Sequence, residues 1–531
     1  MKKAVFTLSA LAMTISLIAG GIVHNTNQSA SFIRIPVRDA AFGIDAAYYN
    51  PAGLFRLNDG FHLSLSNQYI SQNRNIKSTF PGMNLSEFEG SVTAPVFPTA
   101  YAVYKKNRFA FSLGFNPIGG GGSALFEKGL PSFEMQPSMI PASLTAAGIP
   151  TSQYSLDTEF EGKSIYYGFQ GGVSYKVRDE ISFSLGLRYV TMSNSYTGFL
   201  KNIMINPNYP VIGYSGSMVP ATTFFNDLST YLIGVSNALN NTGNSLQKII
   251  DNGYGNTPLA KGTILGMSPE QIAALQGGIM QVGGDPTGMT IAQAQQFYYG
   301  ASAQFDANSK TMANNAIATS DKGVDATQKG SAIIPIIGMN LQFTENFNMS
   351  VKYEFKAKVD VENDTKKDDV GMFPDKAKVP SDIPGMISVG LQYAPFERLK
   401  LHAGFHQYFD RKVQYGKQIN NQYVDNYDVM SDDYKEYGLG LEFAITKKFL
   451  VSAGYLKTQT GVKEIYQSDL DHSLSTNSFA GGFRYNFNEK IGVDLGVMNT
   501  KYKEDTRDFG LYKETYNRKN FVAALGIDIS F

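Results

Sequence analysis

Residues 347–359 read FNMSVKYEFKAKV, and apolar and polar side chains alternate along most of this stretch. The apolar face and the polar face separate cleanly: Phe347, Met349, Val351, Tyr353, Phe355 and Val359 against Asn348, Ser350, Lys352, Glu354, Lys356 and Lys358. Successive side chains of a β-strand point to opposite faces, so this spacing predicts a strand with one oily side. Residues 108–116 repeat the pattern.

About fourteen such strands follow residue 60. We place them at 60–71, 96–105, 108–117, 163–177, 180–199, 331–343, 346–360, 383–394, 397–414, 433–445, 448–460, 475–487, 490–503 and 520–531. Every second connection is short, and the longest of the others runs from 200 to 330. Transmembrane barrels alternate short turns with long external loops, whereas a soluble sandwich does not sort its connections this way. The sequence therefore predicts an all-β, transmembrane antiparallel β-barrel.

The first residues carry an export pattern. Lys2 and Lys3 precede an apolar stretch at 10–19, which ends in small residues. This order is typical of a secretory signal peptide, and an uncleaved anchor helix is the alternative. We predict that residues 1–21 are the signal peptide and that residues 60–531 form the barrel.

The last predicted strand alternates up to a terminal aromatic residue, Phe531. The barrel-assembly machinery of the outer membrane is expected to recognise such an end. Lipid forbids an open sheet edge, because unpaired backbone groups are costly there. We therefore expect the last strand to pair with the strand that begins near residue 60.

Composition excludes several function classes. The formal net charge is zero, which gives no bulk attraction to nucleic acid, and no cysteine is available for disulfide or thiol chemistry. The glycine run at 119–122 lacks the Lys-Ser/Thr of a phosphate loop. No Ser/His/Asp set has a recognisable spacing. We expect no enzymatic activity and no cofactor, although an outer-membrane hydrolase stays open without support.

Two groups resemble metal ligands. His402 and His406 would lie about 13 Å apart in a strand, too far to share a metal, and we expect them to line the lumen with Lys400. The acidic residues of 425–433 offer oxygen ligands for Ca²⁺, but their spacing fits no known loop. A solvated external loop is the favoured interpretation, and we expect no metal site.

Residues 22–59 precede the first strand and lack its alternation. They mix apolar residues such as Phe32 and Ile33 with the charged Arg34 and Arg38. We predict a hatch that plugs the lumen; the alternative is a disordered leader.

The two longest predicted loops, 118–162 and 200–330, contain many apolar residues. Helices are expected at Thr222–Asn240, after Ser268-Pro269 and from Thr290. One interpretation of the two loops is that they form a hydrophobic groove that binds apolar ligands. The candidate groove residues are Leu125, Phe126, Phe133, Met135, Phe224, Phe225, Leu228 and Leu232. The other interpretation is that the helices simply pack against each other.

The stretch from Asp45 to Leu54 contains Asn50, Pro51 and Ala52. It resembles the Asn-Pro-Ala motif in the hatch of the FadL family, outer-membrane transporters of long-chain fatty acids and other hydrophobic compounds. The resemblance extends over essentially the whole mature chain, with a hatch, fourteen strands and large loops after the third and fifth strands. The loop after the fifth strand is longer than is usual in the family.

The resemblance implies passive uptake of hydrophobic small molecules. A ligand would lodge between the two large loops, move to an internal pocket and leave sideways into the outer-membrane lipid. The gap in the third strand would fall at Phe115, Asn116, Pro117 and Gly119. Proline lacks the N–H of a ladder and glycine weakens a strand, so wall pairing is expected to fail there. Arg34 and Arg38 would either hold a carboxylate head group or contact lumen acids.

Two other functions stay open. One is a general porin, which needs an open lumen, and the other is a structural or docking barrel for secreted proteins. We expect a monomer in the outer membrane of a Gram-negative bacterium, with hydrophobic small molecules as ligands. Fatty acids are one class of such ligands.

Overall fold

The structure is a computed structural model that describes residues 22, 24–419 and 422–531. The predicted signal peptide at 1–21 lies outside the described residues. The described chain divides into two compact units. One comprises residues up to Ser132 together with 158–199 and 322–531, and the other comprises 133–157 and 200–321.

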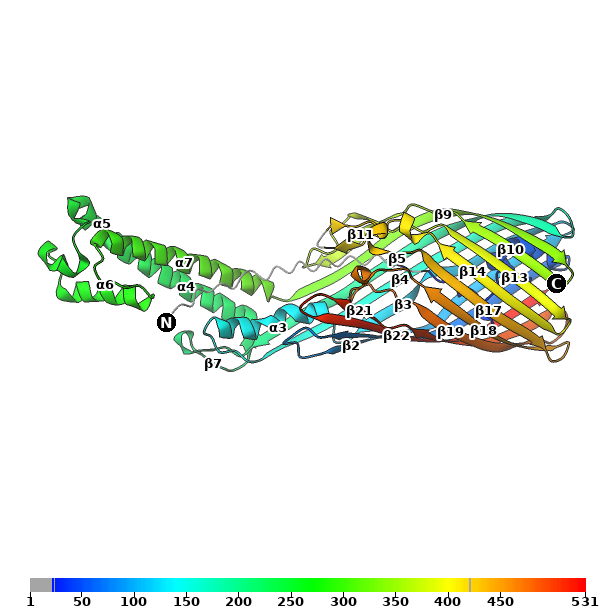
Figure 1. Ribbon diagram of the computed structural model, residues 1–531, viewed down its shortest axis with the longest axis horizontal. Helices are drawn as coiled ribbons and strands as arrows, with labels where there is room; N and C mark the ends of the chain where they lie inside the picture. Colours follow the sequence, from blue (N-terminus) through cyan, green and yellow to red (C-terminus); the bar gives the residue numbers. More distant parts are fainter. Residues whose placement is uncertain (1–21, 23, 420–421) are drawn as a thin grey trace. The chain divides into compact units, whose positions relative to one another are not determined.

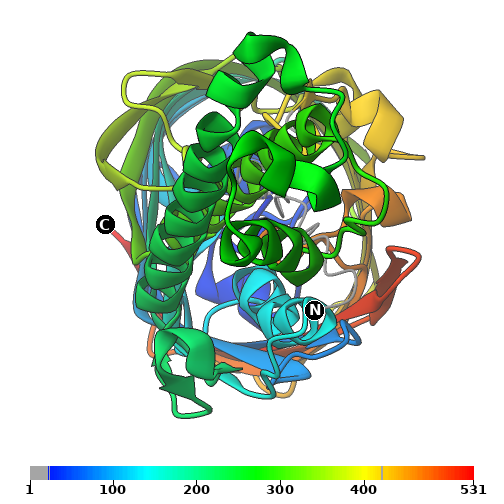
Figure 2. The ribbon, with the colours of Figure 1, turned by 90° about the vertical axis from the view of Figure 1, so that its left-hand side faces the viewer.

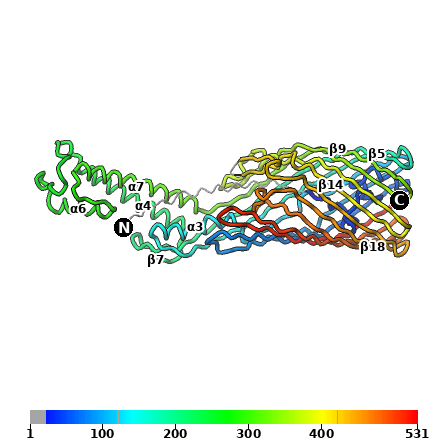
Figure 3. The backbone as a smooth tube through the Cα atoms, viewed as in Figure 1, coloured from blue at the N-terminus to red at the C-terminus, as the bar shows by residue number. Residues whose placement is uncertain are grey.

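The larger unit is a closed barrel of fourteen antiparallel strands, as predicted (Figure 1). The wall strands are β1 (Gly60–Ser78), β2 (Glu87–Lys106), β3 (Phe109–Phe126), β4 (Tyr154–Lys176), β5 (Ile181–Ile205), β9 (Lys322–Thr344), β10 (Phe347–Glu354) with β11 (Asp360–Asp368), β13 (Met386–Phe396) with β12 (Lys378–Pro380), β14 (Leu399–Tyr408), β17 (Tyr434–Ala444), β18 (Phe449–Gln459), β19 (Thr476–Asn486), β20 (Ile491–Tyr502) with β21 (Asp505–Asp508), and β22 (Lys513–Ser530). They cross the barrel obliquely (Figure 3).

The barrel closes by pairing its first and last strands. The β1–β22 register runs without irregularity from His62↔Ser530 to Ser78↔Glu514. At the end of this seam the amide of Phe531 donates to the carbonyl of Phe61 at 2.9 Å. The predicted closure is therefore confirmed.

The outer face of the barrel is apolar. Leu113, Leu185 and Leu439 are all at least 60% exposed, whereas the inward residues of β10, such as Asn348 and Lys352, are buried. A closed sheet with apolar side chains outside and polar ones inside is the arrangement of a transmembrane barrel. Separately, no helix in the described part of the chain is both long and apolar enough to cross a membrane.

The strand limits differ from the prediction at the loop ends. Residues 118–126 belong to β3, so the connection predicted at 118–162 is confined to 127–153, and the one predicted at 200–330 to 206–321. Conversely, the strand expected at 346–360 breaks after Glu354, and the one expected at 397–414 ends at Tyr408. The parts of the strands that extend beyond the bilayer do not need strict apolar/polar alternation. Alternation therefore did not identify these loop-end residues as strand.

The smaller unit is mainly helical. It contains most of α3 (Pro131–Ala146), then α4 (Ala221–Ser245), α5 (Gln247–Ile249), η3 (Ile250–Tyr254), η4 (Leu259–Leu265), α6 (Pro269–Gln281) and α7 (Ile291–Ala318). Short strands β6 (Asn208–Tyr209), β7 (Tyr214–Ser215) and β8 (Val219–Pro220) precede α4. The expected helix starts are confirmed, since Ser268 and Thr290 both form capping boxes.

Two serine pairs fix α4 against α7. The hydroxyls of Ser236 and Ser302 each donate to the other's carbonyl, at 2.8 and 2.9 Å, and Ser229 and Ser309 do the same. Pairs of small residues seven apart let the two helix backbones approach closely. The helices therefore form a tight antiparallel hairpin.

Candidate functional site

The segment before β1 lies inside the ring of strands (Figure 2). It contains α1 (Ala30–Arg34), α2 (Ala46–Tyr49) and η1 (Pro51–Arg56), and nearly every residue from 26 to 55 is buried. Its apolar residues Phe32, Tyr48 and Leu54 pack in one cluster with wall residues. We call residues 24–57 the plug.

The Asn-Pro-Ala stretch attaches the plug to the wall strands. The amide of Asn50 donates to Oδ1 of Asn340 at 2.9 Å. The carbonyls of Pro51 and Ala52 accept hydrogen bonds from the hydroxyls of Ser174 and Ser182, both at 2.6 Å. Asn50 is therefore held through its side chain, and Pro51 and Ala52 are held through their backbone carbonyls, which small inward-facing serines can reach.

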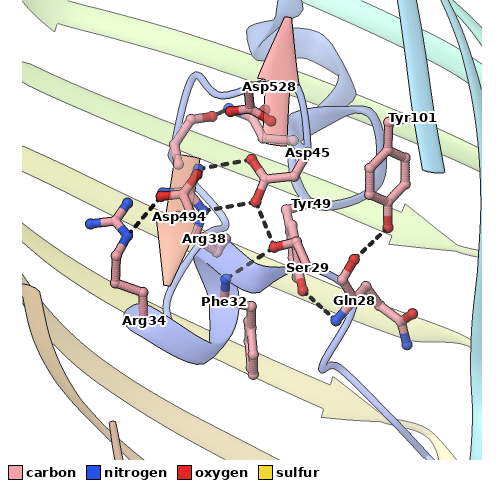
Figure 4. A network of polar contacts seen from close by, with 12 residues as sticks. Gln28, Ser29, Phe32, Arg34, Arg38, Asp45, Tyr49, Tyr101, Asp494 and Asp528 are labelled. Carbon is pink, nitrogen blue, oxygen red and sulfur yellow. Dashed lines mark hydrogen bonds and ion pairs between the residues drawn. The ribbon is translucent and has the colours of Figure 1, made fainter. Parts of the chain in front are cut away.

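Arg34 and Arg38 are both held in ion pairs (Figure 4). Arg34 contacts Glu442 at 2.8 Å and Asp494 at 3.0 Å, and Arg38 pairs with Asp45 at 2.8 Å. Of the two interpretations of these arginines, contact with acids inside the barrel is the one that the geometry supports. A role as head-group contacts stays a prediction.

A histidine of β14 also holds the plug. Both ring nitrogens of His406 face carboxylates, with Asp39 at 2.6 Å and Glu436 at 2.8 Å. Carboxylates only accept, so both nitrogens donate and the ring is an imidazolium. His402 is buried beside Glu442, so both histidines face the lumen as predicted.

The ladder between β2 and β3 is interrupted. Its pairs run from Lys106↔Phe109 to Ala100↔Phe115, and the next pair is Ser91↔Leu125. Residues 92–99 of β2 and 116–124 of β3 therefore face each other without ladder pairs. We call this region the break.

Sequence explains the break. Pro95 and Pro98 of β2 and Pro117 of β3 all lie in it, and none has an N–H to donate. On its other side β3 stays paired with β4, with register shifts after Pro117 and after Gly120. Gly120 has φ +82°, and a Cβ there would collide with the Ser164 carbonyl, so the distorted strand needs glycine. Of the four predicted gap residues, Asn116, Pro117 and Gly119 lie in this region, whereas Phe115 is still paired with Ala100.

The plug covers the break from inside. The amide of Gln28 donates to the carbonyl of Pro117 and its Oε1 accepts from Nδ2 of Asn116, both at 2.8 Å. His24 forms a β-bridge with Gly119. Tyr101 fixes Gln28 in turn, because its hydroxyl donates to the Gln28 carbonyl at 2.8 Å (Figure 4).

Apolar lumen side chains flank the break. One is the cluster in which the plug packs, and it also contains the wall residues Ile70, Phe97 and Val522. A second lies on β4, β5, β9, β11 and β12, with Val190 and Ile336 among its members. Ile118, the residue after Pro117, packs against both clusters. Its side chain therefore connects the two apolar clusters at the break.

Comparison with known proteins shows which fold this arrangement has. No protein-family model and no curated protein matches the sequence. A solved structure of a FadL homologue from Pseudomonas aeruginosa matches with a TM-score of 0.57 and 14% identity, covering 97% of this chain and 100% of that chain. The chain has the FadL fold.

A second structure agrees with this assignment. The Pseudomonas putida toluene transporter TodX matches with a TM-score of 0.50 and 14% identity, covering 96% of this chain and 100% of that one. The resemblance seen at Asn50, Pro51 and Ala52 is thus confirmed at the level of the FadL fold.

The candidate groove residues fall into different places. Leu125 and Phe126 are strand residues of β3, paired with Glu161 and Phe160. In the smaller unit, four residues of α4 are almost fully buried against α7 and the end of α3: Phe224, Phe225, Leu228 and Leu232. These four residues therefore pack helix against helix, which is the second of the two interpretations of the loops.

Two further candidates lie on α3, where Met135 is buried and Phe133 is half-buried. A ligand groove in the loops stays a prediction.

The acidic loop separates its carboxylates. Asp432 pairs with Lys435 at 2.6 Å, and Asp433 accepts from Gln407 and from the amide of Arg411. Within the described residues no group of histidine and acidic side chains is placed to hold a metal ion.

Proposed function

We propose that this protein is a FadL-family transporter that takes up hydrophobic small molecules passively across the outer membrane. The observation that carries the proposal is the break between β2 and β3, where two apolar lumen clusters meet at Ile118. A molecule captured by the external loops enters the lumen and leaves through this opening into the bilayer. Apolar cargo has a lower free energy in lipid than in the aqueous periplasm, so this exit is favourable.

The names of the structural neighbours support this function. A FadL homologue and a toluene transporter share the fold over nearly the whole chain. Neither is named as an enzyme, and we propose a transport protein without catalytic activity.

The plug argues against a general porin. Its ion pairs through Arg34 and its backbone bonds through Pro51 and Ala52 fasten it across the lumen. A general porin needs a continuous water-filled path. We therefore expect little steady ion conductance from the purified barrel in a planar bilayer, and a large steady conductance would contradict the proposal.

Cross-linking tests the route. The chain has no cysteine, so paired cysteines can be introduced at Ala94 and Ile118, on opposite sides of the break, and joined with a short bismaleimide. We expect uptake of a radiolabelled apolar solute by Gram-negative cells to fall at least several-fold on cross-linking.

The control joins two strands where the ladder is complete. Ser478 and Thr500 are register partners of β19 and β20, and their hydroxyls lie 2.8 Å apart. A cross-link between cysteines at these positions should leave uptake unchanged. Equal uptake with and without the Ala94–Ile118 cross-link would exclude exit through the break.

A further inference from the structure

Three lysines lie in one row on the outer face of the barrel, on strands that are coloured orange to red in Figure 1. Lys519 of β22 is the register partner of Lys501 of β20. Lys501 and Lys457 of β18 are both register partners of Asn477 of β19, which lies between them. All three lysines are exposed, whereas Thr500, the residue before Lys501, is buried and faces the lumen. We call Lys457, Lys501 and Lys519 the lysine row.

The positive charge of the lysine row is not compensated. None of its three ammonium groups forms an ion pair or a hydrogen bond with any residue that the structure describes. Other lysines at the loop ends of the same strands or their neighbours differ: Lys435 pairs with Asp432 at 2.6 Å, and Lys513 pairs with Asp508 at 2.9 Å. The row therefore stands out on this part of the barrel as a group of lysines without acidic partners.

The ladder brings these charges close together. Lys501 and Lys519 are directly opposite each other, and like charges in this arrangement are destabilising. Neighbouring strands are about 4.8 Å apart, so the backbones at Lys501 and Lys457 are about 10 Å apart. The carboxylate of Glu504, which follows β20, accepts a hydrogen bond from the amide of Asn517 at 3.2 Å. An anion held between the lysines would offset their repulsion, and their flexible stems let the ammonium groups converge on it.

An apolar band begins directly beside the row, towards the short turns. The next outward-facing residues of three of these strands are aromatic: Phe521 of β22, Phe479 of β19 and Tyr455 of β18. Along β22 every second residue of 521–529 faces outward and is apolar, and this span matches the about 9–11 residues with which a strand crosses the hydrocarbon core. Aromatic side chains are typical of the two edges of such a band. The lysine row therefore lies at the level of the lipid head groups.

The row belongs to the end of the barrel that carries the long connections. β22 runs from Lys513 at that end to Ser530 beside the short turns, and Lys519 lies in its first half. In an outer-membrane barrel the long connections face the outside of the cell. The head groups that the lysines meet are therefore those of the outer leaflet.

We propose that Lys457, Lys501 and Lys519 bind the phosphate group of a lipid of the outer leaflet, whose acyl chains lie against Phe479 and Phe521. A lipid phosphate supplies the negative charge that the row lacks, and basic clusters beside a membrane attract anionic head groups. The exposed aromatic residues next to the row hold the chains of the same molecule, which a soluble anion does not have. The proposal goes beyond uptake, because it concerns the lipid around the barrel and depends on neither cargo nor route.

Fluorescence quenching by brominated lipids tests the site. The chain contains no tryptophan, so F479W places a single one beside the row in the parent and in every variant. The full chain is reconstituted in phosphatidylcholine vesicles that contain brominated phosphatidic acid or brominated phosphatidylcholine. The parent should bind phosphatidic acid about ten- to hundredfold more tightly, since each basic residue near an anionic head group contributes about fivefold. In K457Q/K501Q/K519Q the two lipids should bind within about twofold of each other.

Two further variants separate the lysine row from charge in general. K457R/K501R/K519R keeps the three charges and should keep the preference for phosphatidic acid. K329Q/K366Q/K367Q removes the same number of charges from β9 and β11, where the lysines pair with Asp364, Asp325 and Asp369. It should keep the preference within about twofold of the parent. Heat-modifiable migration on gels shows that each variant is folded.

The results that would overturn the lipid site are specific. One is equal binding of the two lipids by the parent, and another is an unchanged preference in K457Q/K501Q/K519Q. Loss of the preference in K329Q/K366Q/K367Q would assign it to net charge instead of the row. Displacement of phosphatidic acid by millimolar inorganic phosphate would mean that the lysines hold a soluble anion. None of these results bears on exit through the break, so failure of this proposal leaves the uptake proposal standing.

Discussion

The β1–β22 seam and the break between β2 and β3 are separated by only two strands, β1 and β2, yet they are built differently. The seam pairs without a register shift along almost the full length of both strands, and neither strand contains a proline. The break contains Pro95, Pro98 and Pro117 together with a glycine run. The barrel thus places its backbone defects in one position, and the seam shows that continuous pairing was possible nearby.

The plug also contacts different parts of the wall in different ways. It meets β20, which pairs with the seam strand β22, through an ion pair between Arg34 and Asp494. It meets the break through the neutral amide of Gln28. Buried ion pairs are costly to disrupt, whereas hydrogen bonds of a neutral amide cost less, so we expect the contact between plug and break to open before the ion pairs do.

The largest expected effect comes from placing a defect in the seam. Ala524 pairs with Gln68 on one side and Gly496 on the other. Proline there removes a ladder bond and costs about 3 kcal/mol or more, with unpaired groups left at a lipid-facing wall. We expect A524P to yield little closed barrel, measured as loss of heat-modifiable migration. Normal folding would mean that the seam tolerates the defects found in the break.

Removing an ion-paired anchor comes next. R34A leaves Glu442 and Asp494 buried without this partner, and breaking such a pair costs about 3–5 kcal/mol. We expect lower stability to denaturant and a rise in ion conductance as the plug loosens. R34K should retain part of both properties. If R34A remains as stable and as closed as the parent, the ion pairs do not fasten the plug.

Repairing the break should have a smaller effect of opposite sign. P95T/P98T/P117T restores three N–H donors, and each new hydrogen bond is worth about 0.5–1.5 kcal/mol. We expect greater resistance to urea together with slower uptake of an apolar solute. Faster uptake by this variant would contradict exit between β2 and β3.

The smallest effect is expected from the contact between plug and break. Q28A removes three neutral hydrogen bonds, two of them to β3, and leaves Nδ2 of Asn116 without this acceptor, at a cost of about 1–3 kcal/mol. We expect nearly normal folding and faster hydrogen exchange of the backbone amides in 118–124. Unchanged exchange would show that Gln28 does not hold this part of β3.

Much of the barrel could be predicted because its pattern is local. Two-residue alternation identifies strands such as 347–354 without knowledge of their partners, and closure follows from the cost of an edge in lipid. The weak point at Pro117 was also predictable from proline and glycine. The side on which pairing fails was not, because Pro95 and Pro98 matter only once β2 is known to face β3.

Some features could not be predicted because they depend on contacts between distant parts of the chain. Lys457, Lys501 and Lys519 belong to different strands, and only the ladder register brings them into one row. The residues of α4 that we considered for a groove have helical spacing whether they face a ligand or another helix. Burial against α7 decides between these alternatives, and it depends on the tertiary structure.

The same seam has a consequence for the order of folding. It joins the residues that are farthest apart in the barrel, such as Phe61 and Phe531, so it carries the largest loop-closure entropy and should form late. The plug precedes β1 in the chain and is enclosed by the finished ring. We expect it to occupy the interior while the ring closes, so that Arg34, which pairs with Glu442 of β17 and Asp494 of β20, can help to align these later strands.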